Sequence, residues 1–568
     1  MVKVYAADFE TTTKEDDCRV WAWGICDIQD EESFKYGTDI ESFMNYIPAL
    51  NGTIYFHNLK FDGAFILDML LRNGYTWTAK RYLGEKEFTT LISDMGVWYS
   101  IEIRFKNAKS GLEKRIKILD SLKIIPMSIA QMPKAFNIQE EKLEIEYTED
   151  REVGHQLTEE EIAYLKHDVI ILAKALKFMR ENGQKKMTTG ANALNFFIKM
   201  LGKDNYERMF PKLNPADDAD IRKSYKGGFT YLNPIYKEQE IGTGSVYDVN
   251  SMYPWAMKYC MLPYGDPVYY QGEYKPCKLY PLYVQCLLCE FKLKQGRIPS
   301  IQIKNNFRYV DTEYLTQSDG PTILYLTSVD YELFLHNYEV NIISYEGGYM
   351  LKGKTGIFAD YIDYWYNVKD ESRTAGNTGM ERIAKLMLNS LYGKFGSKLT
   401  GKSKIPFLDE EQNKVRFYIG PEEQRKPGYL PIATFITSYC RDNIIRSAEK
   451  CGDRFIYADT DSLHIKGTEL PPIDIDNHRL GAFKLESTFE KAKFIRQKTY
   501  FELTNGKANI KCAGMPENIK KQLTFDQFKT GAIFGGKLMP KTVPGGVILR
   551  ETTFEIKKAK SVDISLVM

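Results

Sequence analysis

Two aspartates separated by one residue mark the part of the chain with the clearest chemistry. The segment YADTDS, residues 457–462, lies between β-branched, aromatic and apolar residues, which are typical of strands. We therefore expect a hairpin whose tip presents the carboxylates of Asp459 and Asp461 on one face. Like charges held together are unfavourable unless a cation neutralises them, and oxygen ligands suit a hard ion such as Mg²⁺. On its own, such a pair is more often an exposed acidic turn.

A third aspartate, far upstream, favours the metal interpretation. Asp248 lies in the short β-rich run SVYDVN, residues 245–250, and a turn follows. If the strands that carry Asp248 and Asp461 face each other, their carboxylates could hold two metal ions ~3.5–4 Å apart. Such a pair of ions polarises the attacking and leaving oxygens of an in-line phosphoryl transfer.

A helix with a polar face is expected between these two segments, where residues 385–395 (KLMLNSLYGKF) run into a glycine. Lys385, Asn389 and Tyr392 are spaced i, i+4 and i+7, so they share one face of that helix. A cation, an amide and an aromatic ring on one face suit a triphosphate and a base better than they suit a core. Each of the three motifs is a weak signal alone, but their occurrence in this order is a strong one.

A second acidic set lies near the N-terminus. Asp8 and Glu10 end the first expected strand, and Asp62 follows another short β run. Asp168 lies on an expected helix, with Tyr164 one turn before it. Four acids and a tyrosine could hold two divalent ions and orient a water, which is what phosphodiester hydrolysis requires. A set of unrelated surface acids is the alternative, but three of the four stand at the ends of apolar β runs.

The bulk properties bound the class of protein. A chain of 568 residues is too long for one core and predicts several domains, and no run approaches the roughly 18 apolar residues of a membrane span. The net charge of +2 does not by itself indicate nucleic-acid binding. Residues 511–568 contain ten Lys or Arg and five Asp or Glu, a net of +5 that favours contact with a phosphate backbone. Nine scattered cysteines fit reduced thiols in a cytosol, and the chain enters its first expected strand without a signal peptide.

The motifs DVNSMYP, KLMLNSLYGKF and YADTDS resemble those of family B DNA polymerases, and most closely the terminal-protein-primed type of small bacteriophages (the phage phi-29 type). The resemblance extends from Asp8 to about Lys557. It implies an α/β multidomain fold, with a ribonuclease-H-like 3′–5′ exonuclease domain and a right hand of palm, fingers and thumb with two palm insertions. The implied divisions are the exonuclease domain (1–187), palm (188–259), insertion 1 (260–356), fingers (357–397), insertion 2 (398–420), palm (421–510), and thumb with C-terminal tail (511–568).

The same resemblance implies a DNA-dependent DNA polymerase that proofreads with its own 3′–5′ exonuclease. It would replicate a viral genome by protein priming with processive strand displacement, as a monomer in the cytoplasm of a bacterial host and without a membrane. Its partners would be template and primer DNA, dNTPs and a terminal protein that contacts insertion 1. Each active site would use two Mg²⁺ ions, for which Mn²⁺ substitutes.

The resemblance also assigns residues to the polymerase site and to the exonuclease site. In the polymerase site Asp248, Val249 and Asp461 would bind metal, Asp459 would support them, and the dNTP would contact Val249, Tyr253, Lys385, Asn389 and Tyr392. In the exonuclease site Asp8, Glu10, Asp62 and Asp168 would bind metal, with Tyr164 as a further catalytic residue. DNA contacts would come from Thr11, Asn58, Phe61, Phe65, Ser121, Leu122 and Lys142 at the frayed primer end, from Tyr225, Gly227 and Gly228 at the template, and from Lys498 and Tyr500 at the primer terminus.

The residues themselves leave structural alternatives open. Phe65 could be buried core, residues 225–229 could be a plain tight turn, and residues 496–500 could be an exposed edge strand whose lysine resists aggregation. Three features depart from the family. Glu381 stands where the family often has a lysine one turn before Lys385, and Arg382 beside it could substitute for that lysine. The segment between Tyr500 and Cys512 is shorter than the family leads us to expect, and a tail continues from Lys557 to the end of the chain.

Three other functions compete with this interpretation. A dedicated nuclease would leave the three polymerase motifs without a purpose. A non-catalytic replication scaffold would be expected to have lost at least one metal-binding acid, and none is missing. A DNA- or RNA-primed family B polymerase shares every catalytic motif, so that only the long insertion after Asp248 separates the two.

Overall fold

The N-terminal part of the chain is built on an eight-stranded mixed sheet in the order β3-β2-β1-β4-β8-β7-β6-β5. The computed structural model describes residues 3–80, 82–106, 113–143, 151–302, 314–426 and 428–558, so the predicted C-terminal tail lies mostly outside the described residues. The strands are β1 (Lys3–Thr11), β2 (Val20–Asp27), β3 (Asp30–Gly37), β4 (Gly52–Phe56), β5 (Thr76–Trp77), β6 (Glu87–Ile92), β7 (Trp98–Lys106) and β8 (Glu113–Asp120).

Alternation along β1 explains how this sheet is covered on both faces. Ala6 belongs to a core shared with helix α4 (Glu159–Glu181), whereas Ala7 and Phe9 belong to a core shared with helices α1 (Ile40–Tyr46) and α2 (Asp62–Arg72). Helix α4 begins at Thr158, and the capping box that its sequence predicts, with Glu161 as the partner, is present. The carboxylates of β1, α2 and α4 are thereby brought to the same part of the domain.

The palm is a five-stranded sheet in the order β22-β11-β21-β20-β9. Its strands are β9 (Thr230–Leu232), β11 (Gly244–Val249), β20 (Phe455–Asp459), β21 (Ser462–Lys466) and β22 (Phe483–Phe489), and helices α8 (Met252–Tyr259) and α13 (Leu430–Cys451) pack against each other beside it. A second sheet in the order β10-β23-β24-β25 follows, made of β10 (Glu240–Ile241), β23 (Lys491–Arg496), β24 (Thr499–Thr504) and β25 (Lys507–Cys512). Strand β25 crosses the predicted palm–thumb division at residue 510.

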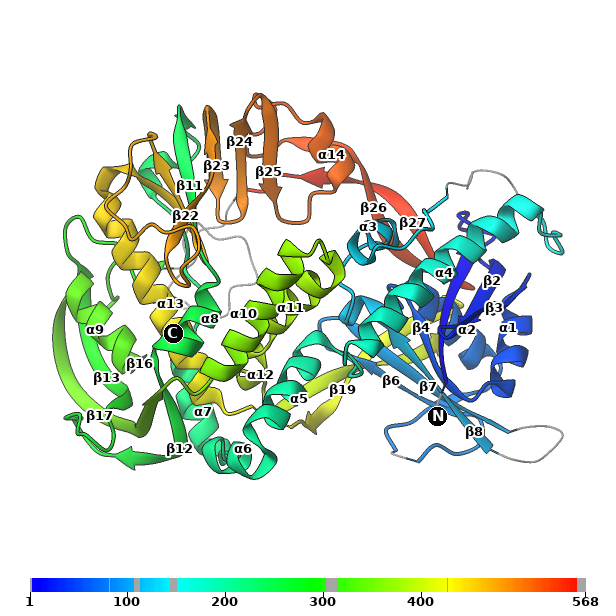
Figure 1. Cartoon of the computed structure of the whole chain (residues 1–568), viewed down its shortest axis with the longest axis horizontal. Helices are drawn as coiled ribbons and strands as arrows, with labels where there is room; N and C mark the ends of the chain where they lie inside the picture. The colour runs from blue at the N-terminus through cyan, green and yellow to red at the C-terminus, as the bar shows by residue number, and fades with distance from the viewer. Residues whose placement is uncertain are drawn as a thin grey trace.

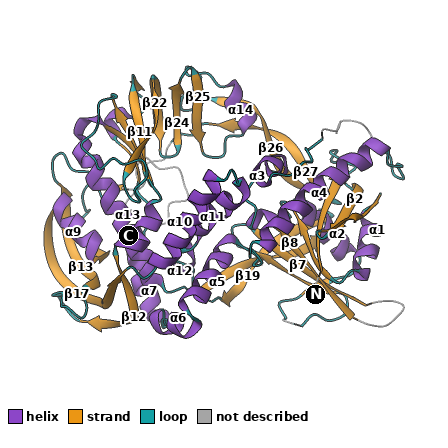
Figure 2. Ribbon diagram, viewed as in Figure 1, coloured by secondary structure: helices purple, strands orange, loops and turns teal. Residues whose placement is uncertain are grey.

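Helices fill the space between the palm and the N-terminal sheet (Figure 2). Helices α10 (Ala359–Thr374) and α11 (Thr378–Ser390) pack on each other as a pair, and α11 also contacts α5 (Thr189–Leu201). The short helix α12 (Tyr392–Phe395) follows α11, and α6 (Lys203–Met209) and α7 (Pro215–Ser224) lead into the palm.

Insertion 1 is folded, as its aromatic, β-branched and turn residues predict. It forms a four-stranded antiparallel sheet in the order β12-β17-β13-β16. Its elements are β12 (Met261–Tyr270), β13 (Leu282–Leu293), β14 (Ile301–Gln302), β15 (Tyr314–Leu315), β16 (Thr322–Thr327), α9 (Ser328–Asn337) and β17 (Tyr338–Thr355). The Cys286–Cys289 pair lies buried on β13, which agrees with a structural role.

Insertion 2 is an antiparallel hairpin of β18 (Thr400–Asp409) and β19 (Lys414–Gln424), and it runs four residues past the predicted end at 420. It docks on the N-terminal domain, where Trp98 and Phe417 make an edge-to-face ring contact at 5.8 Å. Arg72 of α2 also donates to the Asn413 side chain at the tip of the hairpin, at 2.7 Å.

The thumb also contacts helix α2, beside insertion 2. Its elements are α14 (Glu517–Gln522), β26 (Ile533–Val543) and β27 (Gly546–Glu555), and β26 and β27 extend toward the N-terminal domain in Figure 1. At the hairpin tip, the Gly545 N–H donates to Asp68 of α2 at 3.3 Å. Helix α2 therefore holds both the thumb tip and insertion 2.

The loop at residues 225–229 approaches the palm hairpin closely. The Thr460 N–H donates to the Phe229 carbonyl at 2.7 Å. A Cβ atom on Gly228 would lie 2.8 Å from the Thr460 methyl carbon and 3.2 Å from the Tyr253 hydroxyl, whereas a Cβ on Gly227 would meet nothing within 4 Å. Only the second glycine is therefore required by packing within the protein.

We expect Gly228→Ala to destabilise the DNA-free protein by about 1–3 kcal/mol, because the Thr460 side chain must move to admit the new methyl group. Gly227→Ala is the matched control, since open space surrounds that position. The thermal unfolding midpoint of the two variants measures the difference. Equal midpoints would contradict the packing argument.

Candidate active sites

The palm hairpin forms as predicted, but its two acids do not alternate along a strand. Strands β20 and β21 pair with Asp459 opposite Ser462, and the Asp461 N–H donates to the Asp459 carbonyl at 2.7 Å. Thr460 lies between the acids with φ +65°, a left-handed conformation that turns the chain. Asp459 therefore ends β20 and Asp461 lies in the turn, so the strand alternation used for the prediction does not apply, although burial and the charge of Asp459 both help to raise the pKa of Asp461. Asp459 accepts from the Lys498 ammonium at 3.0 Å.

Asp248 and Asp461 are brought together by β11 and β21. Asp248 is paired with Ser462 in the sheet, and the Val249 N–H donates to the Asp461 carbonyl at 2.8 Å. Burial, and then the charge of Asp461, raise the pKa of Asp248 to about 7. Burial also raises the pKa of Asp461. The nearby Lys484 ammonium, 3.7 Å from Asp248, only partly offsets this. Two carboxylates in this situation suit a hard divalent cation.

A third carboxylate, that of Glu486, lies near this pair, although none of the sequence motifs includes it. Glu486 lies on β22, and its negative charge adds to the rise in pKa of both Asp248 and Asp461. On β11, Val246 is opposite Ser487 and Tyr247 is opposite Leu485, so Glu486 is the extra residue of a β-bulge. A bulge re-aims a side chain. Residue spacing alone could not have identified Glu486, because the bulge depends on the pairing register.

Apart from Val249, which ends β11, the predicted nucleotide residues come from two helices and the start of a third. The rings of Tyr253 (α8) and Tyr392 (α12) stack at 4.2 Å with an interplanar angle of 10°. Lys385 and Asn389 are exposed on α11, which ends at Ser390, so the single helix predicted to continue through Tyr392 is interrupted.

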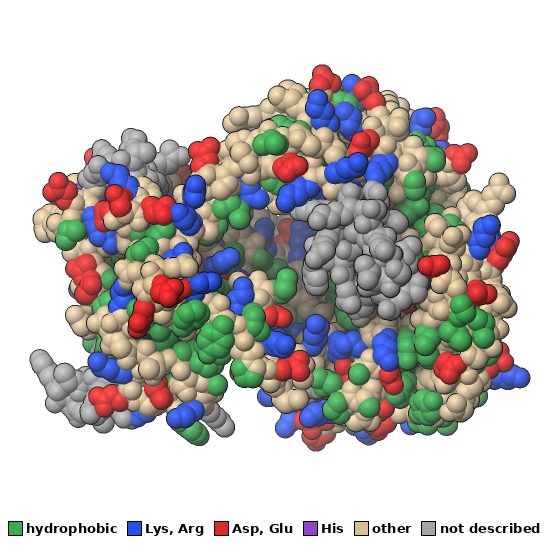
Figure 3. All heavy atoms as spheres, turned by 180° about the vertical axis from the view of Figure 1, so that it is seen from behind, with side chains coloured by type: hydrophobic (Ala, Val, Ile, Leu, Met, Phe, Trp, Pro, Cys, Tyr) green, Lys and Arg blue, Asp and Glu red, His purple; other side chains and the backbone are tan. Residues whose placement is uncertain are grey.

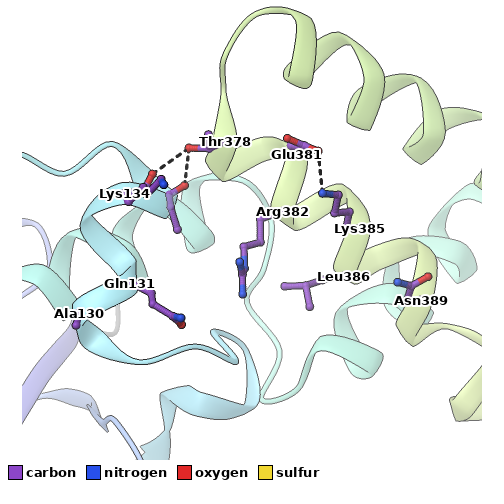
Figure 4. A pocket seen from close by; sticks show the side chains of 10 residues that line it. Ala130, Gln131, Lys134, Thr378, Glu381, Arg382, Lys385, Leu386 and Asn389 are labelled. Atoms are coloured by element: carbon purple, nitrogen blue, oxygen red, sulfur yellow. Dashed lines mark hydrogen bonds and ion pairs between the residues drawn. The ribbon is translucent and has the colours of Figure 1, made fainter. Parts of the chain in front are cut away.

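A cavity of about 640 Å³ lies beside the contact between α11 and the short helix α3 (Met132–Phe136) of the N-terminal domain, where the Thr378 hydroxyl donates to the Ala135 carbonyl at 2.9 Å (Figure 4). Lys385 and Asn389 line it, and Arg382 extends into it toward Gln131. Arg382 is therefore separate from the ion pair that Lys385 makes with Glu381 at 2.8 Å. The substitution of Arg382 for a family lysine stays a prediction.

The loop with the predicted template residues is anchored by a buried arginine that the sequence motifs do not include. Arg441 of α13 is 2% exposed and donates to the carbonyls of Lys226 at 3.0 Å and of Gly227 at 2.8 Å. Its guanidinium also pairs with Asp330 of insertion 1 at 2.7 Å. Gly227 is exposed, and Tyr225 is half-buried.

The primer-terminus prediction needs a correction. Lys498 has φ +54° and lies in the turn between β23 and β24, so Lys498 and Tyr500 are not side by side on an extended chain. Tyr500 is 7% exposed and packs against Tyr457 and His464 at ring distances of 5.4 and 5.1 Å. The Lys498 ammonium is paired with Asp459, and burial, together with the negative charges of Asp459 and Glu486, raises the pKa of Tyr500.

The second acidic set gathers as predicted in the N-terminal domain. Asp8 and Glu10 lie on β1, Asp62 is the first residue of α2, and Asp168 lies on α4 beside the buried Tyr164. Burial, followed by the charge of Asp168, raises the pKa of Asp8 to about 7. Burial, followed by the charge of Asp8, raises the pKa values of Glu10 and Asp62 well above normal. The four acids therefore repel one another in a dry environment, which a divalent cation would relieve.

Lys142 supplies a positive charge to this acidic set. Its ammonium is ion-paired with Asp168 and lies 5.3 Å from the centre of the Tyr164 ring. The other oxygen of Asp168 is buried and has no hydrogen-bond partner among the described residues, so it is available to a cation. Across the described ranges, no group of three or more His, Cys, Asp or Glu could hold a metal ion by itself. A bound ion would therefore need water or phosphate oxygens to complete its ligands.

The residues predicted to hold a single strand differ in exposure. Asn58 is exposed with φ +67°, and Thr11, Phe61 and Leu122 are half-buried. Phe65, at 1% exposure, and Ser121, at 0%, are buried, which favours the core alternative given for Phe65, and contact of either residue with DNA stays a prediction.

Each buried residue has a structural role. The Phe65 ring packs under Gly546 of the thumb hairpin, and the Ser121 hydroxyl donates to the Phe56 carbonyl. The sequence analysis missed Asp120, which is 1% exposed. Its carboxylate accepts from the N–H groups of Asn58 at 3.1 Å and Leu122 at 3.0 Å and so shapes this edge of the site.

The molecule is hollowed in its middle, and Lys and Arg side chains surround the opening in Figure 3. A cationic rim of this kind attracts a polyanion. In the part of the chain that the structure describes, no helix combines the length and apolar character needed to cross a bilayer.

Comparison of this chain with known proteins identifies its family. The family model described as "DNA polymerase type B, organellar and viral" matches residues 44–152 and 140–479. The chain is 43% identical over 577 residues to the DNA polymerase of Bacillus phage M2, with 98% of this chain and 100% of that protein covered. It is 34% identical over 590 residues to the DNA polymerase of Streptococcus phage Cp-1, with 98% and 99% covered.

The fold agrees with these matches. The solved structure of phi29 DNA polymerase, complexed with primer-template DNA and incoming nucleotide substrates, superposes with a TM-score of 0.92 at 41% identity. The match covers 98% of this chain and 100% of that one. Both the α/β multidomain fold and the resemblance inferred from the three motifs are confirmed. The chain belongs to the organellar and viral family of type B DNA polymerases.

Proposed function

We propose that this protein is a DNA-directed DNA polymerase that extends a primer along a DNA template by nucleotidyl transfer. The proposal rests on one observation: strands β11 and β21 bring Asp248 and Asp461 together. Their carboxylates are half-buried and repel each other. The family supports it, because relatives of full length are DNA polymerases. Mg²⁺, for which Mn²⁺ can substitute, is the ion that this oxygen-rich donor set fits.

In this proposal two Mg²⁺ ions, when bound, activate the primer 3′-hydroxyl and neutralise the triphosphate. Asp248 and Asp461 hold them, and the backbone of Val249 adjoins the same place. Tyr253 limits the space beside the sugar of the incoming nucleotide, and Lys385 binds its phosphates. Lys498 contacts the primer terminus and leaves Asp459 to do so.

We also propose a 3′–5′ exonuclease at Asp8, Glu10, Asp62 and Asp168, with Tyr164 beside them. The exposed Asn58 and the half-buried Thr11, Phe61 and Leu122 are the members of the predicted set that a single strand can reach. Lys142 then leaves Asp168 and pairs with a phosphate group of the substrate. The domain divisions given by the resemblance, adjusted to the end of β19 at Gln424, describe how these activities are distributed.

Initiation by a terminal protein is the finer part of the proposal. Insertion 1 is a folded sheet and is joined to the template loop through Asp330 and Arg441. A priming hydroxyl on a partner protein would then take the place of the primer 3′-hydroxyl at the same metal-binding acids. We propose that the polymerase works as a monomer in the cytoplasm of a bacterial host.

Separate sites predict separable activities. We expect Asp248→Asn or Asp461→Asn to lower dNTP incorporation by about 10³-fold or more, because several kcal/mol of charge stabilisation is lost. The same variants should degrade single-stranded DNA normally. The pair Asp8→Asn and Asp62→Asn should do the reverse. Loss of both activities in a variant that remains folded would refute the two-site arrangement.

A steric role for Tyr253 predicts weaker selection against ribonucleotides in Tyr253→Val. Removing the ring gives a 2′-hydroxyl room, so the ratio of ribonucleotide to dNTP insertion should rise by about two orders of magnitude, equivalent to ~2.7 kcal/mol. Single-nucleotide insertion kinetics measure the ratio, with Tyr392→Val as a comparison because Tyr392 stacks on Tyr253. An unchanged ratio would make Tyr253 a packing residue.

A terminal-protein role for insertion 1 predicts that resurfacing its exposed residues Ile323 and Ile343 with lysine weakens protein-primed initiation at least tenfold, about 1.4 kcal/mol. Extension of a DNA primer should stay within about twofold of the parent, because both residues lie on strands of insertion 1, β16 and β17, and neither belongs to the palm sheet. Labelled dNMP transferred to the partner protein reports initiation. Equal loss of both reactions, or of neither, would remove support for this part of the proposal.

A further inference from the structure

One carboxylate on the fingers is held between two cations. A single oxygen of Glu381 lies 2.8 Å from the Lys385 ammonium and 3.1 Å from the Arg373 guanidinium, so it links α11 to α10. The Glu381 side chain is only 17% exposed, whereas those of Lys385 and Arg373 are 53% and 55% exposed. Figure 4 shows the Glu381–Lys385 pair at the top of α11. The acid is sheltered, and the cations are open to solvent on their other sides.

These cations belong to a larger positive cluster that leads toward the polymerase acids. Burial, and then the charges of Arg373, Lys385 and Lys484, lower the pKa of Lys369 to about 8, although Asp370 acts in the opposite direction. Lys484 in turn lies 3.7 Å from Asp248. Cations from α10, α11 and β22 are therefore close enough to repel one another. Such a cluster suits the spread negative charge of a polyphosphate.

A carboxylate that already pairs with these cations competes with any phosphate for them. We propose that Glu381 is an affinity-determining residue: an internal anion that occupies Arg373 and Lys385 until the triphosphate of an incoming nucleotide displaces it. This inference rests on the proposed polymerase function. The displaced Glu381 is available to pair with the two cations again once pyrophosphate departs, which favours release of the product as well as limiting the affinity for the substrate.

A purely structural role for Glu381 makes a different prediction. Glu381 lies in the first turn of α11, where a negative charge stabilises the helix dipole. The N-terminus of that helix is nevertheless already capped by Asn377, whose side chain accepts from the Met380 N–H at 3.0 Å. If Glu381 acted only through the helix dipole or by positioning, neutralising its charge would leave nucleotide affinity unchanged or weaken it. Competition for the cations requires the affinity to increase.

The test compares Glu381→Gln with the parent protein in steady-state incorporation on a primed template. We expect the KM for dNTP to fall by about three- to tenfold, since partly exposed ion pairs are individually weak. The difference should shrink as the salt concentration rises, because both the pairs and the phosphate contacts are screened. Glu371→Gln is the matched control. It removes the same charge from α10 at an exposed residue, and no ion pair involving Glu371 occurs among the described residues.

A second measurement separates this inference from the proposed function. Binding of inorganic tripolyphosphate, with Mg²⁺, to the DNA-free protein should be tighter in Glu381→Gln than in the parent and unchanged in Glu371→Gln. A KM that is unchanged or raised, together with unaltered tripolyphosphate binding, overturns the role of Glu381. If the parent protein incorporates no dNTP at all, the polymerase proposal fails, while tripolyphosphate binding still decides whether Glu381 competes for the cations. Retained single-strand degradation shows that the variant is folded.

Discussion

The structure depends on holding two carboxylates together where they repel each other. The Val249 N–H bond to the Asp461 carbonyl fixes the separation of the strands that carry Asp248 and Asp461, at 2.8 Å between the bonded atoms. The energetic cost of this arrangement is visible in the pKa of Asp248, which burial and the charge of Asp461 raise to about 7. The palm sheet must therefore be rigid enough to resist the repulsion. A five-stranded sheet backed by the long helix α13 meets that requirement.

Other elements reach the same hairpin from distant parts of the chain. Phe229 accepts the Thr460 N–H, and Gly228 leaves room for the Thr460 side chain. Lys498 pairs with Asp459, while Arg441 holds the loop before Phe229 against insertion 1. The left-handed turn at Thr460 is thus fixed from both sides.

Local sequence rules predicted the elements well where neighbours along the chain decide the outcome. The palm hairpin, the capping box at Thr158 and the folded nature of insertion 1 depend on strand composition, cap chemistry and turn residues. The rules failed where distant segments decide. Glu486 enters the site through a bulge set by pairing with β11, and Phe65 is buried because the thumb hairpin docks on α2. Tyr500 faces an aromatic cluster because the left-handed Lys498 turns the chain.

A common electrostatic pattern connects the acidic sites with the fingers. Lys142 pairs with Asp168, Lys498 pairs with Asp459, and Glu381 pairs with Lys385, so each charged surface carries a counter-charge of its own. Without these partners, like charges would repel one another at each of these sites in the DNA-free protein, and this repulsion would lower its stability. Under the proposals made for Lys142, Lys498 and Glu381, substrates bind by exchange of ionic partners. Exchange limits affinity, and for an enzyme that must release its product and advance by one nucleotide, limited affinity at each contact is compatible with repeated turnover.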